Sequence, residues 1–532
     1  MGIANRIAIN AATRWVAQGV HGITGLLLVP FLLGQLGEAG YGVANVCLRI
    51  VGFSVLADLG LRGALGRQLA EQVTRKDDRR FNELASTALL LYLGISGLLA
   101  LTCIITAPQL AHFFAGGGDK PIDPGLMRQA VFLIRWYAPF HLLVSFTNPV
   151  FVASINSNNR FDLANYALIV VNVARFGAMV LVLSLTGWGL YGWAAAMYFS
   201  EALLLVVYLC LAHRARPSLR LRPSLVNREA MKPLFGLGGY MFTLQLTESI
   251  SVQSDPLVLS RLLGPASLAF YSPGLALTQV VQPIVGTLAH QMHPLTTSFH
   301  VTGQRERLQA VLIRGTRLTW LMGILSSTVL VVFAEPIIRF WIGNRLGPDY
   351  IWAVRVLQAW AVVDLLRFSG GTDWPVLLGM KRLGLLVKIQ VPFSIINIVA
   401  SILLVMYTNL GVVGVVIPTI VLVAISRPIT LVYLTRLLKL PLGRYLMQAY
   451  LRPAIVLALL LVQAAALHYL LPPQHLLTLL GEAAVTGMVW VVLTWLIGLG
   501  DEDRQAIRRM LSGMGGRIRS SRSIPAEQPV GK

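Results

Sequence analysis

The chain has 532 residues, of which 55% are hydrophobic and 13% are charged, and its mean hydropathy is +0.68. This composition excludes an ordinary soluble domain and indicates an integral membrane protein. The formal net charge is +21, but most of the excess lies in short loops between apolar segments, where it faces anionic lipid headgroups. We therefore expect anionic membrane lipids as partners and exclude nucleic acid.

Fourteen segments of the chain are long and apolar enough to cross a bilayer. Each has roughly 20 or more largely apolar residues, the length that an α-helix needs to span the hydrocarbon. The predicted fold class is therefore all-α, a polytopic membrane protein with about 14 transmembrane helices. The predicted spans are residues 12–34, 41–65, 84–106, 129–151, 163–185, 189–211, 234–258, 268–292, 318–338, 352–376, 389–408, 412–434, 453–471 and 477–499.

The basic residues are distributed asymmetrically between the loops. Short loops rich in Lys and Arg stay cytoplasmic during membrane insertion. The loops that join even-numbered to odd-numbered spans, together with the C-terminal tail, contain most of the 44 Lys and Arg residues. Both termini are therefore predicted to be cytoplasmic. The opposite loops contain only Lys120, Arg128, Arg261, Arg339 and Arg345.

Landmarks in the first half of the chain recur in the second half about 225 residues later, as in a duplicated architecture. Each repeat contains an even number of spans, so both repeats should enter the membrane in the same orientation around a central cavity that holds the substrate. The matched positions are Gly37 with Gly264, Pro108 with Pro336, Asn159 with Lys381, and Gly189 with Gly411.

The repeat predicts five parts of the chain. They are a six-helix N-terminal lobe (1–212), a basic cytoplasmic linker (213–233), a six-helix C-terminal lobe (234–436), two further transmembrane helices (437–500) and a basic cytoplasmic tail (501–532). The segments outside the spans are too short for a soluble catalytic domain, so no enzymatic activity is predicted.

Ionisable residues within the spans are candidates for function, because a charge in the bilayer costs several kcal/mol unless it is paired or hydrated. The N-terminal repeat is cationic, whereas the C-terminal repeat is slightly acidic. The first holds Arg14, Arg49, Arg62, Arg135 and Arg175 against Asp58 and Glu201, and the second holds Arg355, Arg367 and Arg427 against Glu248, Asp255, Asp364 and Asp373.

The arginines of the N-terminal repeat suit a phosphate-bearing anion, because guanidinium groups bind phosphate through paired N–H donors. Arg175 lies ~18 Å along its span, near the membrane midplane, and pairing with Glu201 is the open alternative. Arg62 is expected to pair with Asp58, four residues earlier on the same helix face. The predicted substrate-binding residues are Arg175, Arg135, Arg49 and Arg14.

The acidic residues of the C-terminal repeat could take up Na⁺ or H⁺ and couple transport to an ion gradient. The candidates are Glu248, Asp255 and Asp364, although Asp364 could instead pair with Arg367, three residues later. No other cofactor and no metal site is predicted, because the three cysteines are isolated within spans.

Several stretches of the chain resemble a known family, the polysaccharide-transporter branch of the multidrug/oligosaccharidyl-lipid/polysaccharide exporter superfamily, which includes O-antigen and lipid II flippases. The resemblance covers the first twelve predicted spans. It rests on Leu36-Gly37-Glu38-Ala39-Gly40-Tyr41-Gly42, on Asp58-Leu59-Gly60-Leu61 with Arg67, and on Asp255-Pro256 followed by Leu263-Gly264 and Tyr271.

The resemblance implies a flippase of the bacterial cytoplasmic membrane, which works by alternating access between two six-helix lobes. Its substrate would be a polyprenyl-(pyro)phosphate-linked oligosaccharide for cell-surface polysaccharide biosynthesis, and other polysaccharide-assembly proteins would be its partners. The last two spans would then help to shape a groove for the lipid tail.

Two other functions stay open at this point. A multidrug or cation exporter of the related branch would need an acidic, aromatic-lined cavity in its N-terminal lobe, where five arginines are found instead. A membrane-embedded glycan polymerase or ligase would need a sizeable outer loop to hold the acceptor, whereas the longest outer loop, near residues 107–128, is small and Gly-rich.

Overall fold

The computed structural model describes residues 3–58, 60–118, 122–235, 239–505 and 508. Throughout these residues every regular element is a helix, which confirms the all-α prediction. The predicted basic tail lies outside the described residues from position 509 onward. The α-helices are α1 (Ile3–Gly52), α2 (Leu61–Arg75), α3 (Asp78–Ala115), α4 (Pro124–Phe132), α5 (Ala138–Asn156), α6 (Phe161–Thr186), α7 (Leu190–Ala215), α8 (Arg228–Phe235), α9 (Gly239–Leu263), α10 (Ser267–Val301), α11 (Arg305–Val332), α12 (Ala334–Ile338), α13 (Asn344–Leu346), α14 (Tyr350–Phe368), α15 (Asp373–Gly379), α16 (Gly384–Tyr407), α17 (Val416–Leu437), α18 (Leu442–Tyr445), α19 (Arg452–Leu470) and α20 (Leu476–Leu493).

Shorter helical segments join or extend these helices. The 3-10 segments are η1 (Phe53–Asp58), η3 (Pro223–Leu225), η5 (Gly347–Asp349) and η6 (Gly411–Val415). The π-helical segments are η2 (Leu133–Tyr137), η4 (Arg339–Gly343), η7 (Leu446–Leu451) and η8 (Thr494–Gly498).

Ten helical stretches within the described residues are long and apolar enough to span a membrane. Three of the four remaining predicted spans, at 234–258, 268–292 and 352–376, fall largely on α9, α10 and α14, which have 25, 35 and 19 residues. At 1.5 Å per residue, even the shortest of these reaches about 28 Å, close to the thickness of the hydrocarbon. The prediction of a polytopic membrane protein is therefore confirmed.

The second predicted span, 41–65, is not a single helix. Its first part continues α1 after a kink at Gly37 (φ 69°), and the helix then ends at Gly52. The 3-10 segment η1 follows, and Gly60 adopts a left-handed conformation (φ 78°) before α2 begins. Because a left-handed residue cannot continue a right-handed helix, the chain turns here, where the sequence pattern alone predicted an unbroken span.

The backbone supports the internal repeat. Residues with positive φ occur at matched positions of the two halves, about 225 residues apart. Three of the pairs are positions that the sequence had matched, and two of the pairs include residues other than glycine, for which this conformation is uncommon. The pairs are Gly37 with Gly264, Lys76 with Gly303, Gly118 with Gly347, Asn159 with Lys381, and Gly189 with Gly411.

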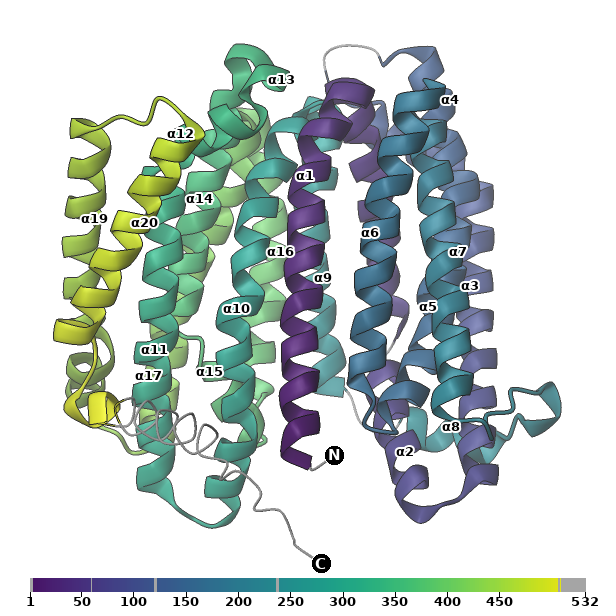
Figure 1. Cartoon of the computed structure of the whole chain (residues 1–532), viewed down its shortest axis with the longest axis horizontal. Helices are drawn as coiled ribbons and strands as arrows, with labels where there is room; N and C mark the ends of the chain where they lie inside the picture. Colours follow the sequence, from purple (N-terminus) through teal and green to yellow (C-terminus); the bar gives the residue numbers. More distant parts are fainter. Residues whose placement is uncertain (1–2, 59, 119–121, 236–238, 506–507, 509–532) are drawn as a thin grey trace, which may run out of the picture. The chain divides into compact units, whose positions relative to one another are not determined.

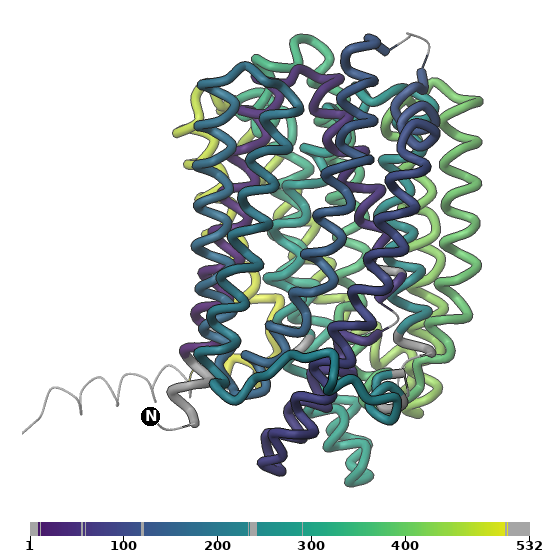
Figure 2. Tube along the Cα trace, turned by 90° about the vertical axis from the view of Figure 1, so that its right-hand side faces the viewer, coloured from purple at the N-terminus to yellow at the C-terminus, as the bar shows by residue number. Residues whose placement is uncertain are grey.

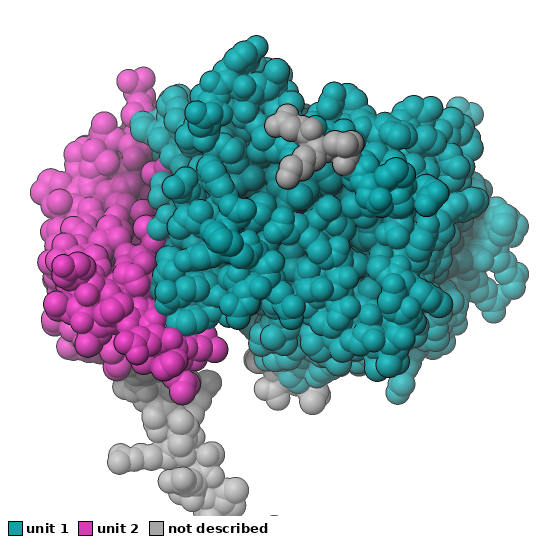
Figure 3. Space-filling view, turned by 90° about the horizontal axis from the view of Figure 1, so that it is seen from above, with its two compact units in different colours: residues 1–284, 334–363, 381–430 teal, residues 285–333, 364–380, 431–532 magenta. Residues whose placement is uncertain are grey.

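The chain divides into two compact units, which Figure 3 colours separately. Unit 1 contains Met1–Ile284, Ala334–Val363 and Lys381–Thr430, and unit 2 contains Val285–Phe333, Asp364–Met380 and Leu431–Lys532. Helices α9 and α16 of the predicted C-terminal lobe pack on each other, and α9 packs on α1, so all three belong to unit 1. The predicted lobe boundaries at residues 212 and 234 stay a prediction.

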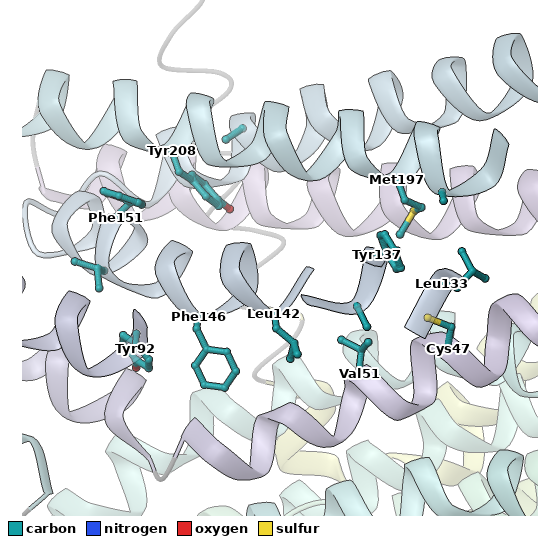
Figure 4. Close-up of a cluster of buried hydrophobic side chains, with 14 of the residues drawn as sticks. Cys47, Val51, Tyr92, Leu133, Tyr137, Leu142, Phe146, Phe151, Met197 and Tyr208 are labelled. Carbon is teal, nitrogen blue, oxygen red and sulfur yellow. The ribbon is translucent and has the colours of Figure 1, made fainter. Parts of the chain in front are cut away.

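In unit 1, long helices pack side by side (Figures 1 and 2). Helix α6 packs on α7 and on α1, and α5 packs on α3 and on α7. Buried aromatic and aliphatic side chains fill the space between them. Figure 4 shows Leu142 of α5 pointing toward the part of α1 that carries Val51, and the ring centroid of Phe146 lies 5.9 Å from that of Tyr92 on α3.

Unit 2 has its own core. Helix α11 packs on α19, and α19 packs on α20. Leu321, Ile324, Val456 and Leu460 are buried between them, and the indole Nε1 of Trp490 donates a hydrogen bond to the carbonyl oxygen of Leu321 at 2.9 Å.

Candidate functional site

A cavity of about 630 Å³ lies within unit 1, between α2, α5, α7 and the start of α6. Its wall combines charged side chains, amides and hydroxyls with aromatic and aliphatic residues. Sites for small molecules are typically of this size, with a few polar groups in a largely apolar wall. The lining residues are Arg62, Gly66, Ala70, His141, Ser145, Asn148, Pro149, Val152, Ala153, Asn156, Ser157, Asn159, Phe161, Glu201, Leu204 and Tyr208.

Helix α5 supplies most of the polar wall. His141, Ser145, Asn148 and Asn156 follow each other at helical spacing, so their side chains share one face of the helix. In a transmembrane helix a row of polar residues cannot face lipid without cost, and here it faces the cavity. We call these four residues the polar row.

Arg62 forms the charged end of the cavity wall. Its Nε lies 3.2 Å from Oδ1 of Asp58, which confirms the predicted pair. The hydroxyl of Tyr92 donates to the same oxygen at 3.0 Å. Asp58 is buried, whereas the Arg62 side chain is 44% exposed. The carboxylate therefore fixes the position of a guanidinium group that stays accessible from the cavity.

A second acceptor for Arg62 comes from the backbone of α5. Nη2 of Arg62 donates to the carbonyl oxygen of Ser145 at 3.3 Å. In a regular helix this carbonyl would accept the N–H of residue 149, but residue 149 is proline, which has no N–H. Because Pro149 cannot donate a hydrogen bond, the carbonyl oxygen of Ser145 is available to accept one from Arg62.

Glu201 of α7 is buried beside two basic side chains. Its Oε1 lies 3.1 Å from Nδ1 of His141 and 3.8 Å from Nη2 of Arg175. Because a carboxylate only accepts hydrogen bonds, Nδ1 of His141 is the donor in this contact. No described residue bonds to the other ring nitrogen, Nε2, and His141 lines the cavity.

Arg175 therefore pairs with Glu201, the alternative that the sequence left open. The contact is long, and Nε of Arg175 is buried without a hydrogen-bond partner within the described residues. The pair does not exclude a role in binding, because a carboxylate that neutralises Arg175 also orients it. Arg175 is joined to the cavity through Glu201 and His141.

The structure brings Arg49 and Asp255, predicted for different roles, into one cluster of unit 1. Nη1 of Arg49 donates to Oε1 of Gln253 at 3.4 Å, and Arg49 lies within electrostatic reach of Asp255. The hydroxyl of Tyr271 donates to Oδ2 of Asp255 at 3.4 Å. An arginine beside an aspartate forms a largely neutral group. Because Arg49 belongs to α1 and Gln253 and Asp255 belong to α9, the cluster also joins these two helices.

The other predicted residues are placed separately. Arg135 lies in η2, and Arg14 lies exposed near the start of α1; neither has a hydrogen-bond or ion-pair partner among the residues described. Glu248 is exposed on α9 in unit 1, and Asp364 is buried in unit 2. In the described part of the chain, the cavity wall includes none of the four arginines predicted to bind substrate.

Sequence reasoning missed the residues of the polar row and assigned Arg62 only a structural pair. The available signal was the spacing of His141, Ser145, Asn148 and Asn156 on one face of a predicted span. A search restricted to formal charges could not find uncharged amides. Among the described residues there is also no cluster of three or more His, Cys, Asp or Glu side chains that could hold a metal ion.

Comparisons with known proteins identify a family and a fold for this chain. The sequence model of a family described as "Polysaccharide biosynthesis protein" matches residues 35–347. The "Putative O-antigen transporter" of Shigella flexneri is 23% identical over 257 residues, which cover 47% of this chain and 58% of that protein. The match thus spans less than two thirds of the relative's own length.

Two solved structures share the fold. The lipid II flippase MurJ, in an inward closed conformation, has a TM-score of 0.67 and 15% identity, and the match covers 90% of this chain and 97% of MurJ. An inward-facing multidrug resistance MATE family transporter of the MOP superfamily has the same TM-score and identity, covering 79% of this chain and 95% of that protein. The structural matches confirm the fold, and the family match over residues 35–347 confirms the resemblance noted in the sequence.

Proposed function

Since the chain belongs to the polysaccharide biosynthesis protein family, we propose that it is a flippase that carries a polyprenyl-(pyro)phosphate-linked oligosaccharide across the bacterial cytoplasmic membrane. The cavity of unit 1 binds the charged and sugar-bearing head of this substrate. The substrate and pathway follow the names of the relatives, an O-antigen transporter and a lipid II flippase.

The observation that carries this proposal is the position of Arg62. Its guanidinium is held by a buried carboxylate and a backbone carbonyl, yet the side chain is 44% exposed and lines the cavity. A fixed guanidinium can bind pyrophosphate without first giving up conformational freedom, which raises affinity for an anion. We assign the (pyro)phosphate to Arg62 and, when the imidazole is protonated, to Nε2–H of His141.

The net charge of the group formed by His141, Glu201 and Arg175 depends on whether the imidazole ring is protonated. With a neutral imidazole, His141, Glu201 and Arg175 together have no net charge, whereas a protonated imidazole gives the group a charge of +1. Arg175 supports binding in this proposal by offsetting the negative charge of Glu201. Arg49, Arg135 and Arg14 stay candidates for contacts with the anion in other states of the cycle.

The proposed direction of transport follows from the loops. The cavity reaches Asn159 and Phe161, at the turn before α6. The distribution of Lys and Arg assigns this turn and both termini to the cytoplasm. The substrate would therefore enter from the side on which lipid-linked sugars are assembled, and coupling to Na⁺ or H⁺ at Glu248, Asp255 or Asp364 would supply the driving force.

A cation or drug exporter is the second candidate, because a MATE transporter shares the fold and because Glu201 contributes an acidic group to the cavity wall. The two candidates differ in the sign of the charge that the site favours. Both charges are paired, Glu201 with His141 and Arg175, and Arg62 with Asp58, but the Arg62 side chain is 44% exposed whereas that of Glu201 is only 6% exposed. This difference favours an anionic substrate.

The test is export of the lipid-linked glycan in cells that lack the native protein. Wild type, Arg62→Ala, Arg62→Lys and the surface variant Arg79→Ala would each be expressed, and the glycan exposed on the outer leaflet would be scored. We expect export with wild type and Arg79→Ala, none with Arg62→Ala, and reduced export with Arg62→Lys, since lysine lacks the planar pair of donors. Normal export without the protein, or with Arg62→Ala at normal abundance, would contradict the proposal.

A further inference from the structure

Two asparagines of the polar row have polar atoms without partners. Asn148 is only 8% exposed, lines the cavity, and its side chain forms no hydrogen bond with any described residue. Oδ1 of Asn156, two helical turns further along α5, is likewise buried without a partner in the described structure. A buried amide that lacks its hydrogen bonds lowers the stability of the folded protein.

Some other asparagines of unit 1 do form hydrogen bonds through their side-chain amides. The amide of Asn158 donates to the carbonyl oxygen of Ser154 at 2.9 Å, and that of Asn172 donates to Leu168 at 2.7 Å. Those amides are satisfied within the protein, whereas Asn148 and Asn156 face the cavity. Because both residues line the cavity, a molecule inside it can supply the hydrogen bonds that their amides lack.

The order of groups along the wall indicates what that molecule is. Arg62 and His141 lie toward one end of the polar row, and Phe161 lies at the turn that follows its other end. Tyr208 of α7 adds a second ring to the wall. A ligand that fits has an anionic group, then neutral hydroxyl or amide groups, then a surface of C–H bonds that can pack on aromatic rings.

We infer that Asn148 and Asn156 form the subsite that recognises the neutral sugar next to the pyrophosphate, and that they help to set which glycans are accepted. This inference rests on the proposed flippase function. An amide can both donate and accept, so it matches sugar hydroxyls and N-acetyl groups. Both amides lie further along α5 than His141, so we expect them to contact the sugar and not the pyrophosphate at Arg62 and His141.

The inference separates recognition of the sugar from recognition of the phosphate. Asn148→Leu and Asn156→Leu keep the approximate volume of the side chain and remove its hydrogen-bonding groups. Loss of one or two hydrogen bonds to the sugar should weaken binding of a sugar-bearing ligand about tenfold for each variant. Affinity for inorganic pyrophosphate should not change.

The experiment uses the full-length protein in lipid nanodiscs and two probes, inorganic pyrophosphate and a short-chain prenyl pyrophosphate that carries one N-acetylhexosamine or hexose. Affinities would be measured by calorimetry for wild type, Asn148→Leu, Asn156→Leu, Arg62→Ala and the matched control Asn172→Leu. We expect the two cavity variants to lose affinity only for the sugar probe, Arg62→Ala to lose it for both, and the control to lose neither.

Thermal unfolding of the empty protein distinguishes recognition from a structural role. If the two amides serve to bind the ligand, replacing either of them by leucine should leave the Tm of the empty protein unchanged or raise it. Residues placed for binding commonly lower the stability of the folded protein. A fall in Tm for both variants, or unchanged affinity for the sugar probe, would overturn the subsite. If wild type bound neither probe, the flippase proposal itself would fail.

Discussion

Arg62 donates a hydrogen bond to the backbone carbonyl of Ser145, an acceptor that is open because Pro149 has no N–H to offer. Proline in a transmembrane helix is usually explained by the kink it causes. In this chain it also provides a hydrogen-bond acceptor on the cavity side of α5, at the residue on which the proposed anion site depends.

Pro149→Ala should weaken the anion site without unfolding the protein. Alanine restores an N–H at residue 149, which would compete with Arg62 for the Ser145 carbonyl. We expect affinity for inorganic pyrophosphate to fall severalfold, as measured by calorimetry in nanodiscs. Pro108→Ala, on α3 away from the cavity wall, is the control, and an equal loss in both variants would argue against this role for Pro149.

Glu201 and Arg175 should be coupled energetically. Glu201→Gln removes the carboxylate that Arg175 and His141 share and leaves a partly buried guanidinium without its counter-charge. We expect the midpoint of thermal unfolding to fall, by the equivalent of about 1–3 kcal/mol. The double variant Glu201→Gln/Arg175→Gln should recover part of the loss. Additive losses in the double-mutant cycle would show that the 3.8 Å contact contributes nothing.

Arg175→Ala should abolish glycan export while the protein still folds and inserts. The change leaves the negative charge of Glu201 opposed only by His141, and an anionic substrate would then meet a repulsive charge in the cavity wall. Export from cells, corrected for protein abundance in the membrane, is the measurement. Normal export by this variant would remove Arg175 from the proposed site.

In unit 2, Asp503 should stabilise the fold, because it pairs with Arg317. Nη1 of Arg317 lies 2.7 Å from Oδ2 of Asp503, and both side chains are at most 10% exposed. Asp503→Ala leaves a buried arginine uncompensated, which typically costs about 3–5 kcal/mol. Asp501→Ala is the matched control, because Asp501 is 82% exposed beside Arg504, and exposed pairs contribute only about 0–1 kcal/mol. Thermal unfolding in detergent should separate the two variants, and equal Tm values would contradict the assignment.

Gly42 should tolerate no side chain. A Cβ at this position would collide with the backbone carbonyl of Pro265, whereas a Cβ at Gly94 would meet no atom within 4 Å. Gly42→Ala should therefore lower stability by about 1–3 kcal/mol, and Gly94→Ala should leave it unchanged or slightly raise it, since alanine favours a helix. Membrane abundance and unfolding temperature of the two variants are the readout.

Sequence patterns predicted the membrane spans and the repeat because both depend on local features. Apolar runs have to be long enough to cross the bilayer, and Gly37 or Gly189 must occupy a conformation that other residues avoid. The sequence pattern did not predict the break in the helix after Gly52, because the residues that follow are largely apolar, as they would be in a continuous membrane span. The break depends on the left-handed conformation of Gly60 and on the hydrogen bond from Tyr92 to Asp58. No local sequence pattern predicts either feature.

The candidate site was only partly predictable. Formal charge identified Arg175 and Glu201, but their pairing with His141 joins three helical segments far apart in the sequence. Arg62 was interpreted as neutralised by Asp58, and the pair is present, yet the guanidinium still lines a cavity. Pairing along a helix can be predicted from spacing, whereas exposure to a cavity depends on how the neighbouring helices pack.

The positive-φ residues shared by the two halves fix the path of the backbone independently of the side chains between them. Both copies keep the same backbone corners, at Gly37 and Gly264 or at Asn159 and Lys381, although the side chains between those corners differ. The side chains on the helix faces between these corners can therefore differ from one half to the other while the path of the backbone stays the same.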